Sequence, residues 1–189
     1  MIIEQIRNEF MLLNQKYIDE TSDKYDFWNN HVKYVVKEAV ELAKKYGADL
    51  EIVELGAILH DIALVARIGL RENHHIAGAK MARILLKKYN YPQEKIERVA
   101  NCVLNHRSNS YTETIEETCV ADADIISHFY NIPMAFIYGV NGRGLYMSGQ
   151  FLNWFKKDYY DLSDQTKVTF KDRYNKIMKF LFDEEFEEI

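Results

Sequence analysis

An adjacent histidine and aspartate, His60-Asp61, end the apolar segment Leu55-Gly-Ala-Ile-Leu. Burying a carboxylate beside so much aliphatic surface is costly unless something compensates its charge. A divalent cation would do so, because imidazole nitrogens and carboxylate oxygens are common metal ligands in proteins. The pair therefore predicts a metal site, provided that the rest of the chain supplies further ligands.

Other metal-competent side chains are spread over several predicted helices. Taken alone, each of the six histidines is more simply explained as a packed or capping residue. Together they indicate ligands that project inward from facing helices, which is how helical bundles build metal sites. The candidates beyond the central pair are His31, His74, His106 and Asp124.

The residues alone leave two choices open. Asp122 and Asp124 are two positions apart, so on a helix they face about 200° apart and only one should point inward. His74 and His75 are adjacent and present the same ambiguity. His128 follows Asp124 by one helical turn and is interpreted as a packed or capping residue that lies near the site.

The apolar residues recur with helical spacing and show no strand alternation. We therefore predict an all-α, single-domain helical bundle over 1–189, with a metal-site core at about 27–128 and C-terminal helices at about 150–182 packed on it. Gly47, Asp49 and Ser163 suit helix ends. The segment 139–149 is predicted to be a flexible connection, and 184–188 a solvated acidic tail. The predicted helices span about 3–18, 27–46, 49–61, 74–89, 92–106, 114–138, 150–161 and 163–182.

Composition narrows the functional class. The net charge of −5 provides no electrostatic footprint for nucleic acid. No apolar run approaches the roughly 20 residues that a membrane span needs, and acids come too early for a signal peptide. Cys102 and Cys119 lack the spacing of a redox motif, so we expect reduced thiols in a cytoplasmic protein.

The order of the candidate ligands resembles the HD-domain superfamily of metal-dependent phosphohydrolases. A bare His-Asp dipeptide is a weak sign, whereas the ordered set at helical positions is specific. The resemblance covers roughly 28–126. Its motifs are His31-Val-Lys-Tyr-Val, Gly56-Ala-Ile-Leu-His-Asp-Ile, His74-His-Ile-Ala-Gly-Ala, Asn105-His-Arg and Ala121-Asp-Ala-Asp-Ile-Ile.

The resemblance implies a choice at both ambiguous positions and a ligand set. It favours Asp124 over Asp122, and His74 over His75. One ion would be held by His31, His60, Asp61 and Asp124, and His74 with His106 would allow a second ion that shares Asp61. With a single ion, His74 and His106 would instead bind phosphate or protonate the leaving group.

The resemblance also implies an activity, namely hydrolysis of a phosphate ester or anhydride, commonly in a nucleotide, by metal-bound water or hydroxide. The mixed ligands suit Mn, Fe, Co, Ni or Zn better than Mg. A narrower alternative is a dinucleoside polyphosphate hydrolase with two metals. Alternatives of other classes are a non-catalytic regulatory module that binds a nucleotide and metal, and a diiron oxygenase.

Loop arginines are the candidates for substrate contacts, because a guanidinium can hold phosphate with two hydrogen bonds. They are Arg67, Arg71, Arg107 and Arg143. The expected partner is a small phosphorylated molecule, and the chain is expected to be a monomer or homodimer. The last two helices carry an apolar face that is interpreted as core rather than interface. Its residues are Phe151, Trp154, Phe155, Phe170, Tyr174, Ile177 and Phe180.

Overall fold

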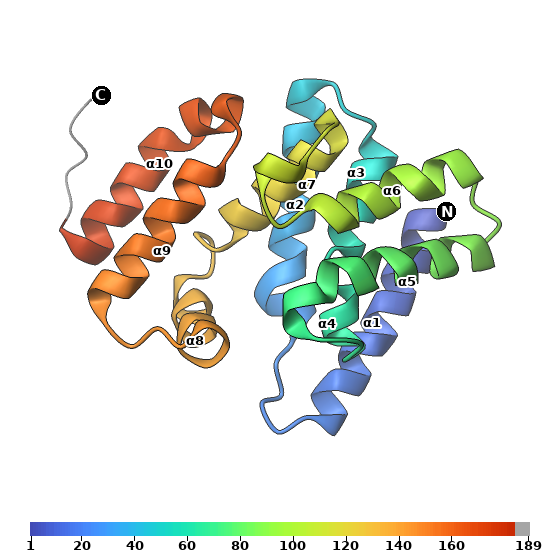
Figure 1. Cartoon of the computed structure of the whole chain (residues 1–189), viewed down its shortest axis with the longest axis horizontal. Helices are drawn as coiled ribbons and strands as arrows, with labels where there is room; N and C mark the ends of the chain where they lie inside the picture. The colour runs from blue at the N-terminus through green and yellow to red at the C-terminus, as the bar shows by residue number, and fades with distance from the viewer. Residues whose placement is uncertain (184–189) are drawn as a thin grey trace.

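The computed structural model describes residues 1–183, with Gly142 excepted, and every regular element in that range is a helix (Figure 1). The predicted all-α class is confirmed. None of these helices is long and apolar enough to cross a membrane. The predicted tail at 184–188 lies outside the described residues. The helices are α1 (Ile2–Glu20), α2 (Lys33–Tyr46), α3 (Leu50–Leu59), α4 (Ile62–Val65), α5 (His74–Lys88), α6 (Gln93–Asn105), α7 (Ile115–Ser127), α8 (Ile132–Arg143), α9 (Ser148–Asp161) and α10 (Asp164–Phe182).

Helix α3 lies at the centre of the bundle, between α1, α2, α6 and α7. It is apolar on more than one side, and Ile52, Leu55 and Ile58 are fully buried. The predicted caps are present at this point. Gly47 ends α2 in the left-handed region at φ 75°, and the Asp49 side chain accepts hydrogen bonds from the first free N–H groups of α3.

The predicted helix over 114–138 is wrong. Helix α7 ends at Ser127, and a turn separates it from α8, which begins at Ile132. Pro133 lies in the first turn of α8, where its missing N–H costs nothing, whereas inside a continuous helix it would remove a hydrogen bond. The predicted flexible connection at 139–149 is also too long, because α8 continues to Arg143 and stops at Gly144 with φ 67°.

Helices α8, α9 and α10 lie together beside the bundle (Figure 1). Phe129, just after α7, joins the two parts, because its ring lies 5.0–5.7 Å from the rings of Phe155, Phe170 and Tyr174. These three rings are buried, as expected for a core face, whereas Phe180 of the same predicted face is 87% exposed. Asp122 adds a polar contact, since it accepts hydrogen bonds from the backbone N–H and hydroxyl of Ser163 at the start of α10.

We predict that Gly56→Ala destabilises the protein by about 1–3 kcal/mol, because an added methyl group overpacks the core. A Cβ at position 56 would lie 2.7 Å from the Cβ of Cys102, which forces α3 and α6 apart. Urea denaturation measures the change. Gly149→Ala is the matched control, since a Cβ there meets nothing within 4 Å. Equal midpoints for both variants would contradict the close packing of these helices.

Candidate metal centre

The end of α3 delivers the central pair. His60 continues the helical backbone and is fully buried, while Asp61 starts the short helix α4 and keeps 12% of its side chain exposed. Helix α5 approaches this turn closely, because a Cβ at Gly78 would lie 3.5 Å from the backbone oxygen of His60. The start of α5, with His74, therefore packs against the pair, and the tight neighbour of a Cβ at Gly78 would be Val103 of α6, at 3.1 Å.

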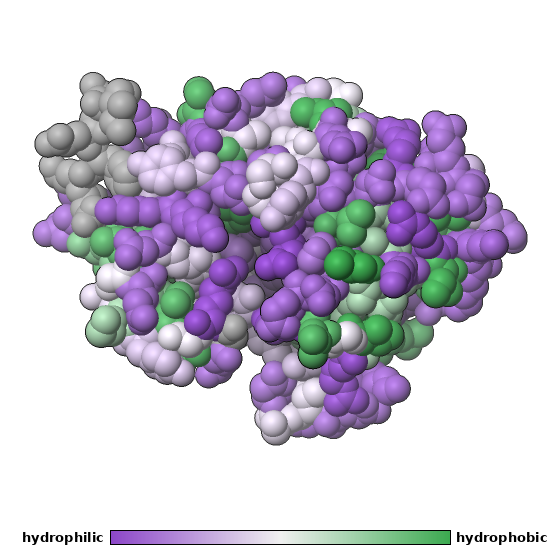
Figure 2. Space-filling view, viewed as in Figure 1, coloured by the Kyte–Doolittle hydropathy of each residue, from purple (hydrophilic) through white to green (hydrophobic). Residues whose placement is uncertain are grey.

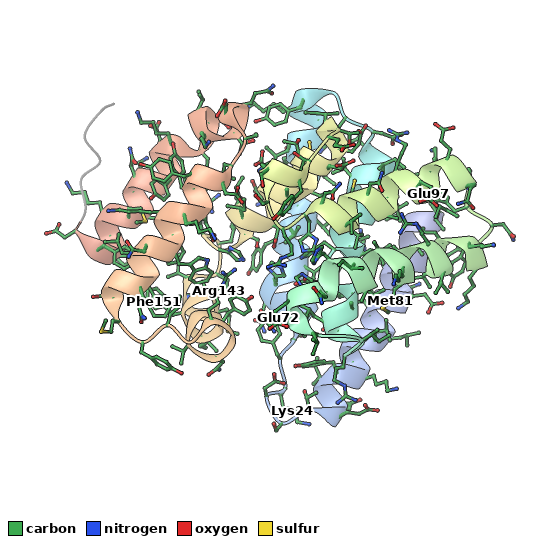
Figure 3. All side chains as sticks on the ribbon, in the orientation of Figure 1. Lys24, Glu72, Met81, Glu97, Arg143 and Phe151 are labelled. Carbon is green, nitrogen blue, oxygen red and sulfur yellow. The ribbon has the colours of Figure 1, made fainter. Side chains whose placement is uncertain are left out.

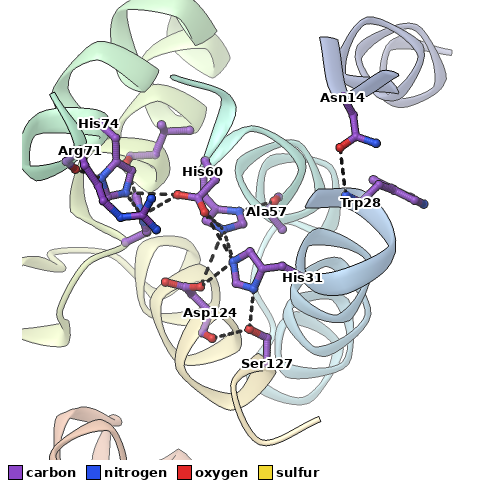
Figure 4. A network of polar contacts seen from close by, with 12 residues as sticks. Asn14, Trp28, His31, Ala57, His60, Arg71, His74, Asp124 and Ser127 are labelled. Carbon is purple, nitrogen blue, oxygen red and sulfur yellow. Dashed lines mark hydrogen bonds and ion pairs between the residues drawn. The ribbon is translucent and has the colours of Figure 1, made fainter. Parts of the chain in front are cut away.

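A first group of ligand atoms consists of His31, His60 and Asp124. The Nε2 atoms of the two histidines lie 2.9 Å apart. One oxygen of Asp124 lies 3.1 Å from Nε2 of His31 and 3.7 Å from Nε2 of His60 (Figure 4). These atoms come from three segments that are far apart in the sequence. They are the helical turn Trp28–Val32, the end of α3 and the last turn of α7.

A second group consists of Asp61, His74 and His106. The Nε2 atoms of His74 and His106 lie 3.1 Å apart, and Oδ1 of Asp61 lies 3.2 and 3.8 Å from them. The other oxygen of Asp61 lies 3.6 Å from Nε2 of both His31 and His60. Each carboxylate oxygen of Asp61 therefore faces one group, which is the arrangement of a carboxylate that can bridge two ions.

Hydrogen bonds at the opposite nitrogens determine the tautomers. Nδ1 of His60, His74 and His106 lies 2.6–2.7 Å from a backbone carbonyl oxygen, which can only accept, so these Nδ1 atoms carry the proton. Nδ1 of His31 lies 3.0 Å from the Ser127 hydroxyl, which donates to the Asp124 carbonyl. In the neutral rings, all of the Nε2 atoms then present lone pairs to the centre.

This donor set fits a divalent metal. Two lone pairs that face each other at 2.9 or 3.1 Å repel unless a cation or a proton lies between them. Neutral imidazoles whose Nδ1–H groups are held by outer hydrogen bonds, together with two carboxylates, are the ligands that transition metals take. One ion would be held by the first group with Asp61, and a second by Asp61, His74 and His106.

The electrostatics keep both carboxylates charged. Burial acts to raise the pKa of Asp61, but the charges of and hydrogen bonds to the surrounding histidines hold it below its ordinary value. Burial also acts to raise the pKa of Asp124, but the hydrogen bond with His31 keeps this pKa well below its usual range. The centre therefore offers two anionic ligands at neutral pH.

The imidazoles divide into two kinds. Burial lowers the pKa of His60, and burial together with the nearby His60 lowers that of His106 to about 4. Burial also acts on His31 and His74, but hydrogen bonds with Asp124 and Asp61, respectively, raise their pKa overall. Each group thus pairs one imidazole that stays neutral with one that competes for a proton.

The alternative residues lie outside both ligand groups. Asp122 is buried and accepts hydrogen bonds from Asn109 and Ser163. His75 contacts the ring of His74 from outside the groups. Nδ1–H of His128 donates to the Asp158 carboxylate at 2.8 Å, and the His128 ring stacks on that of His31. The structure thus brings Asp124 and His74 together with the other candidates, and their assignment as ligands stays a prediction.

The four predicted substrate arginines lie in different settings. Arg67 pairs with Glu20 at 2.7 Å, and Arg107 donates to the carbonyl of Glu72. Arg71 and Arg143 instead lie over the ring of Tyr138, at 4.9 and 5.4 Å from its centroid. Only this second pair converges on one place.

Sequence reasoning missed three neighbours of the site. Ser127 links His31 to Asp124, Asp158 holds His128, and Trp154 packs against His128 with ring centroids 5.3 Å apart. The spacing of Asp124 and Ser127 on one helix face was a usable signal for the first. The other two partners come from α9, and no local pattern identifies them.

If Asp61 bridges two ions, Asp61→Asn should weaken both sites by at least 10-fold, because each loses a charged oxygen. We expect wild-type protein reconstituted with Mn²⁺ or Zn²⁺ to hold up to two ions per chain by mass spectrometry, and the variant to lose both. Asp164→Asn is the control, since its side chain is fully exposed. Loss of a single ion would show that Asp61 belongs to one site only.

The pKa of His106 predicts a pH dependence of metal-free stability. The unfolded chain takes up a proton near pH 6.5, whereas folded His106 takes one up only near pH 4, so stability is lost as pH falls between these values. One such group contributes about 2 kcal/mol between pH 7 and 5.

We expect His106→Gln to remove this part of the pH dependence. The wild type and the variant share all of the other histidines, so the difference between them reports on His106. Urea denaturation in excess chelator at pH 7 and at pH 5 measures it. The wild type should lose about 2 kcal/mol more than the variant between the two pH values. Equal losses would mean that His106 takes up protons normally in the folded protein.

Comparison with known proteins places this geometry in a family. The model of the HD domain matches residues 29–128, a range that contains every residue of both ligand groups. Ribonuclease Y of Fusobacterium nucleatum subsp. nucleatum is 32% identical over 97 residues, which cover 51% of this chain and 18% of that protein. The tRNA (cytidine(56)-2'-O)-methyltransferase of Thermoplasma volcanium is 35% identical over 116 residues, which cover 52% of this chain and 31% of that protein. The match thus spans less than a third of either relative.

Solved structures share the fold over nearly the whole chain. Bacillus subtilis YpgQ has a TM-score of 0.67 at 20% identity, with 97% of this chain and 95% of that chain covered. The same protein in complex with ADP has a TM-score of 0.65 at 21% identity, with 96% and 94% covered. An HD superfamily hydrolase from an uncultured Thermotogales bacterium has a TM-score of 0.64 at 19% identity, with 92% and 87% covered. Since the family model covers more than half of its length, and the ligand groups lie inside the match, this chain belongs to the HD domain family.

Proposed function

We propose that this chain is a metal-dependent phosphohydrolase that acts on a nucleotide or a related phosphate ester or anhydride. The observation that carries the proposal is the position of Asp61, whose two carboxylate oxygens each face one group of ligand atoms. Two ion sites that share a carboxylate are a recurrent arrangement in enzymes of phosphate chemistry.

A divalent ion at these ligands would polarise a phosphoryl oxygen and lower the pKa of a water molecule that it binds. The residues of the chain hold the ligands in place, since each imidazole is oriented through Nδ1 by an outer hydrogen bond. Asp61, Asp124, His31 and His74 keep 12–18% of their side chains exposed, so a substrate can reach them. In the space-filling view, hydrophilic side chains gather along the furrow between the bundle and helices α8–α10 (Figure 2).

The nucleotide part of the proposal is supported by the relatives. YpgQ, which shares the fold, has been crystallised with ADP, and other structures of this fold are named HD superfamily hydrolases. The curated relatives are named for action on RNA, although their match covers half of this chain. The small acidic excess of this chain favours a small phosphorylated substrate over a polynucleotide. The cytoplasmic location, and the monomeric or homodimeric state, stay predictions.

The alternatives differ in what the centre does rather than in its ligands. A dinucleoside polyphosphate hydrolase would use both groups and would show a strong preference for the paired nucleotide. A regulatory module would bind a nucleotide and metal without turnover. The diiron oxygenase would consume oxygen when loaded with iron. The full set of ligands, with each histidine oriented, favours an active hydrolase over the regulatory module.

We predict that the protein, reconstituted separately with Mn²⁺, Fe²⁺, Co²⁺, Ni²⁺, Zn²⁺ or Mg²⁺, releases phosphate from a nucleotide. His60→Gln and Asp61→Asn should lower the rate by at least about 100-fold, because metal assistance supplies several kcal/mol. The measurement is chromatographic separation of the products formed from mono-, di-, tri- and dinucleotides and from a short RNA, together with phosphate release, and Asp164→Asn is the control.

The same panel separates the alternatives. Nucleotide binding by an inactive wild type would favour the regulatory module, and oxygen uptake by the iron-loaded protein would favour the oxygenase. Cleavage of the RNA in preference to the nucleotides would reject the small-molecule substrate.

A further inference from the structure

A belt of aromatic and cationic side chains lies beside the metal centre. It consists of Tyr138 and Arg143 of α8, Trp154 of α9, and Arg71 just before α5. The guanidinium of Arg71 lies 4.9 Å from the ring centroid of Tyr138, and that of Arg143 lies 5.4 Å from it. Arg143 also lies 4.8 Å from the ring of Trp154. Figure 3 shows Arg143 on the α8 side of the boundary and Glu72 on the bundle side. Two cations therefore gather around one pair of rings.

The belt is linked to both groups of ligand atoms, through the backbone of Arg71 and through the ring of His128. At one end, the backbone carbonyl of Arg71 accepts the hydrogen bond from Nδ1 of His74 at 2.6 Å. At the other end, the ring of Trp154 lies 5.3 Å from that of His128, which stacks on His31 at 6.0 Å. The rings and guanidinium groups thus follow the centre from the second group to the first.

This belt contains hydrogen-bond donors that lack acceptors. Trp154 is 6% exposed, and its Nε1 is buried without a partner. An indole N–H can only donate, and leaving a buried donor unpaired is costly. Arg71 and Arg143 are exposed, and neither forms an ion pair with a carboxylate within the described part of the chain, although Arg71 has a hydrogen bond with the Tyr138 side chain. One buried N–H without an acceptor and two guanidinium groups without an anionic oxygen therefore lie together.

The nearby carboxylates are engaged elsewhere. Asp158 is bound to Nδ1 of His128 at 2.8 Å, and Asp161 accepts a hydrogen bond from Ser108 at 2.8 Å. Asp61 and Asp124 face the imidazoles of the centre. Asp61 attracts Arg71 through space, but none of these four carboxylates lies within ion-pair distance of either guanidinium group. An external anion therefore suits this belt, and phosphate fits guanidinium donors especially well.

We propose that Trp154, Arg143 and Arg71 form a second phosphate subsite, which takes a phosphate group other than the one held at the metal ligands. The subsite rests on the proposed function for its substrate. A ligand that fills both places carries at least two linked phosphates, so the preferred substrate is a phosphoanhydride rather than a phosphate monoester. The N–H donors of the belt, on Trp154, Arg143 and Arg71, recognise this second phosphate.

The test compares inorganic pyrophosphate with inorganic orthophosphate as ligands. Isothermal titration calorimetry is done on the full chain, with Mn²⁺ and, separately, in excess chelator. We expect Trp154→Phe, which removes the N–H but keeps an aromatic ring, to weaken pyrophosphate binding about 10-fold. Arg143→Gln should weaken it by at least as much, while orthophosphate binding with Mn²⁺ changes less than 2-fold.

Two control variants isolate the subsite. Trp28→Phe makes the same change in a tryptophan that packs on Phe10, far along the chain from the belt, and Arg83→Gln removes an arginine that pairs with Glu97. Both should bind pyrophosphate as the wild type does. The stability of ligand-free Trp154→Phe separates recognition from folding, because removing an unpaired donor should not lower its urea midpoint.

The outcomes separate this proposal from the proposed function. Equal pyrophosphate affinities in wild type, Trp154→Phe and Arg143→Gln would overturn the subsite, even if nucleotides are hydrolysed. Trp154-dependent pyrophosphate binding in a protein that hydrolyses nothing would support the subsite and reject the enzyme. A wild type that binds orthophosphate as tightly as pyrophosphate would also overturn the subsite.

Discussion

The rest of the structure depends on the convergence of four imidazole nitrogens and two carboxylates. They form two groups, and within each group the candidate ligand atoms lie within 4.8 Å of one another. Nε2 atoms that face each other at 2.9 and 3.1 Å cannot satisfy one another as neutral acceptors. The carboxylates reduce the strain of this arrangement because they attract the proton or the cation that must lie there. Asp61 is central to this balance, since among residues 1–183 it is the one whose carboxylate oxygens face both groups.

The backbone geometry meets this constraint at the ends of helices. Carbonyl groups in the last turn of a helix lack intrahelical partners, so they are free to accept hydrogen bonds from side chains. Two of the candidate ligand histidines, His60 and His106, use this property through Nδ1 to the carbonyl three residues earlier. His74 makes the same contact at the start of α5, to a carbonyl that also accepts its own backbone N–H. The pairs are His60 with Ala57, His74 with Arg71, and His106 with Val103. One local rule thus orients ligands from three separate segments.

Much of this could be predicted from the sequence because the signals are local. The apolar periodicity predicts the bundle, and the costly pair His60-Asp61 points to the centre of it. The break between α7 and α8 has a local signal in Pro133, which the predicted helix over 114–138 does not take into account. Contacts such as Ser127 with His31, 96 residues apart, depend on how helices pack, and no spacing within one helix reveals such a pairing.

The candidate metal ligands and the proposed second phosphate subsite belong to different parts of the chain. Every ligand atom lies within 29–128, the range that the family shares, whereas Arg143 and Trp154 lie beyond it, in α8 and α9. A change in the first range would alter the metal centre and hence the chemistry itself. A change in the second would alter the groups that contact the substrate while the ligands stay in place. Phe129 and Asp122 join the two parts through buried contacts with α9 and α10. Within one fold, the type of reaction and the choice of substrate can therefore vary independently.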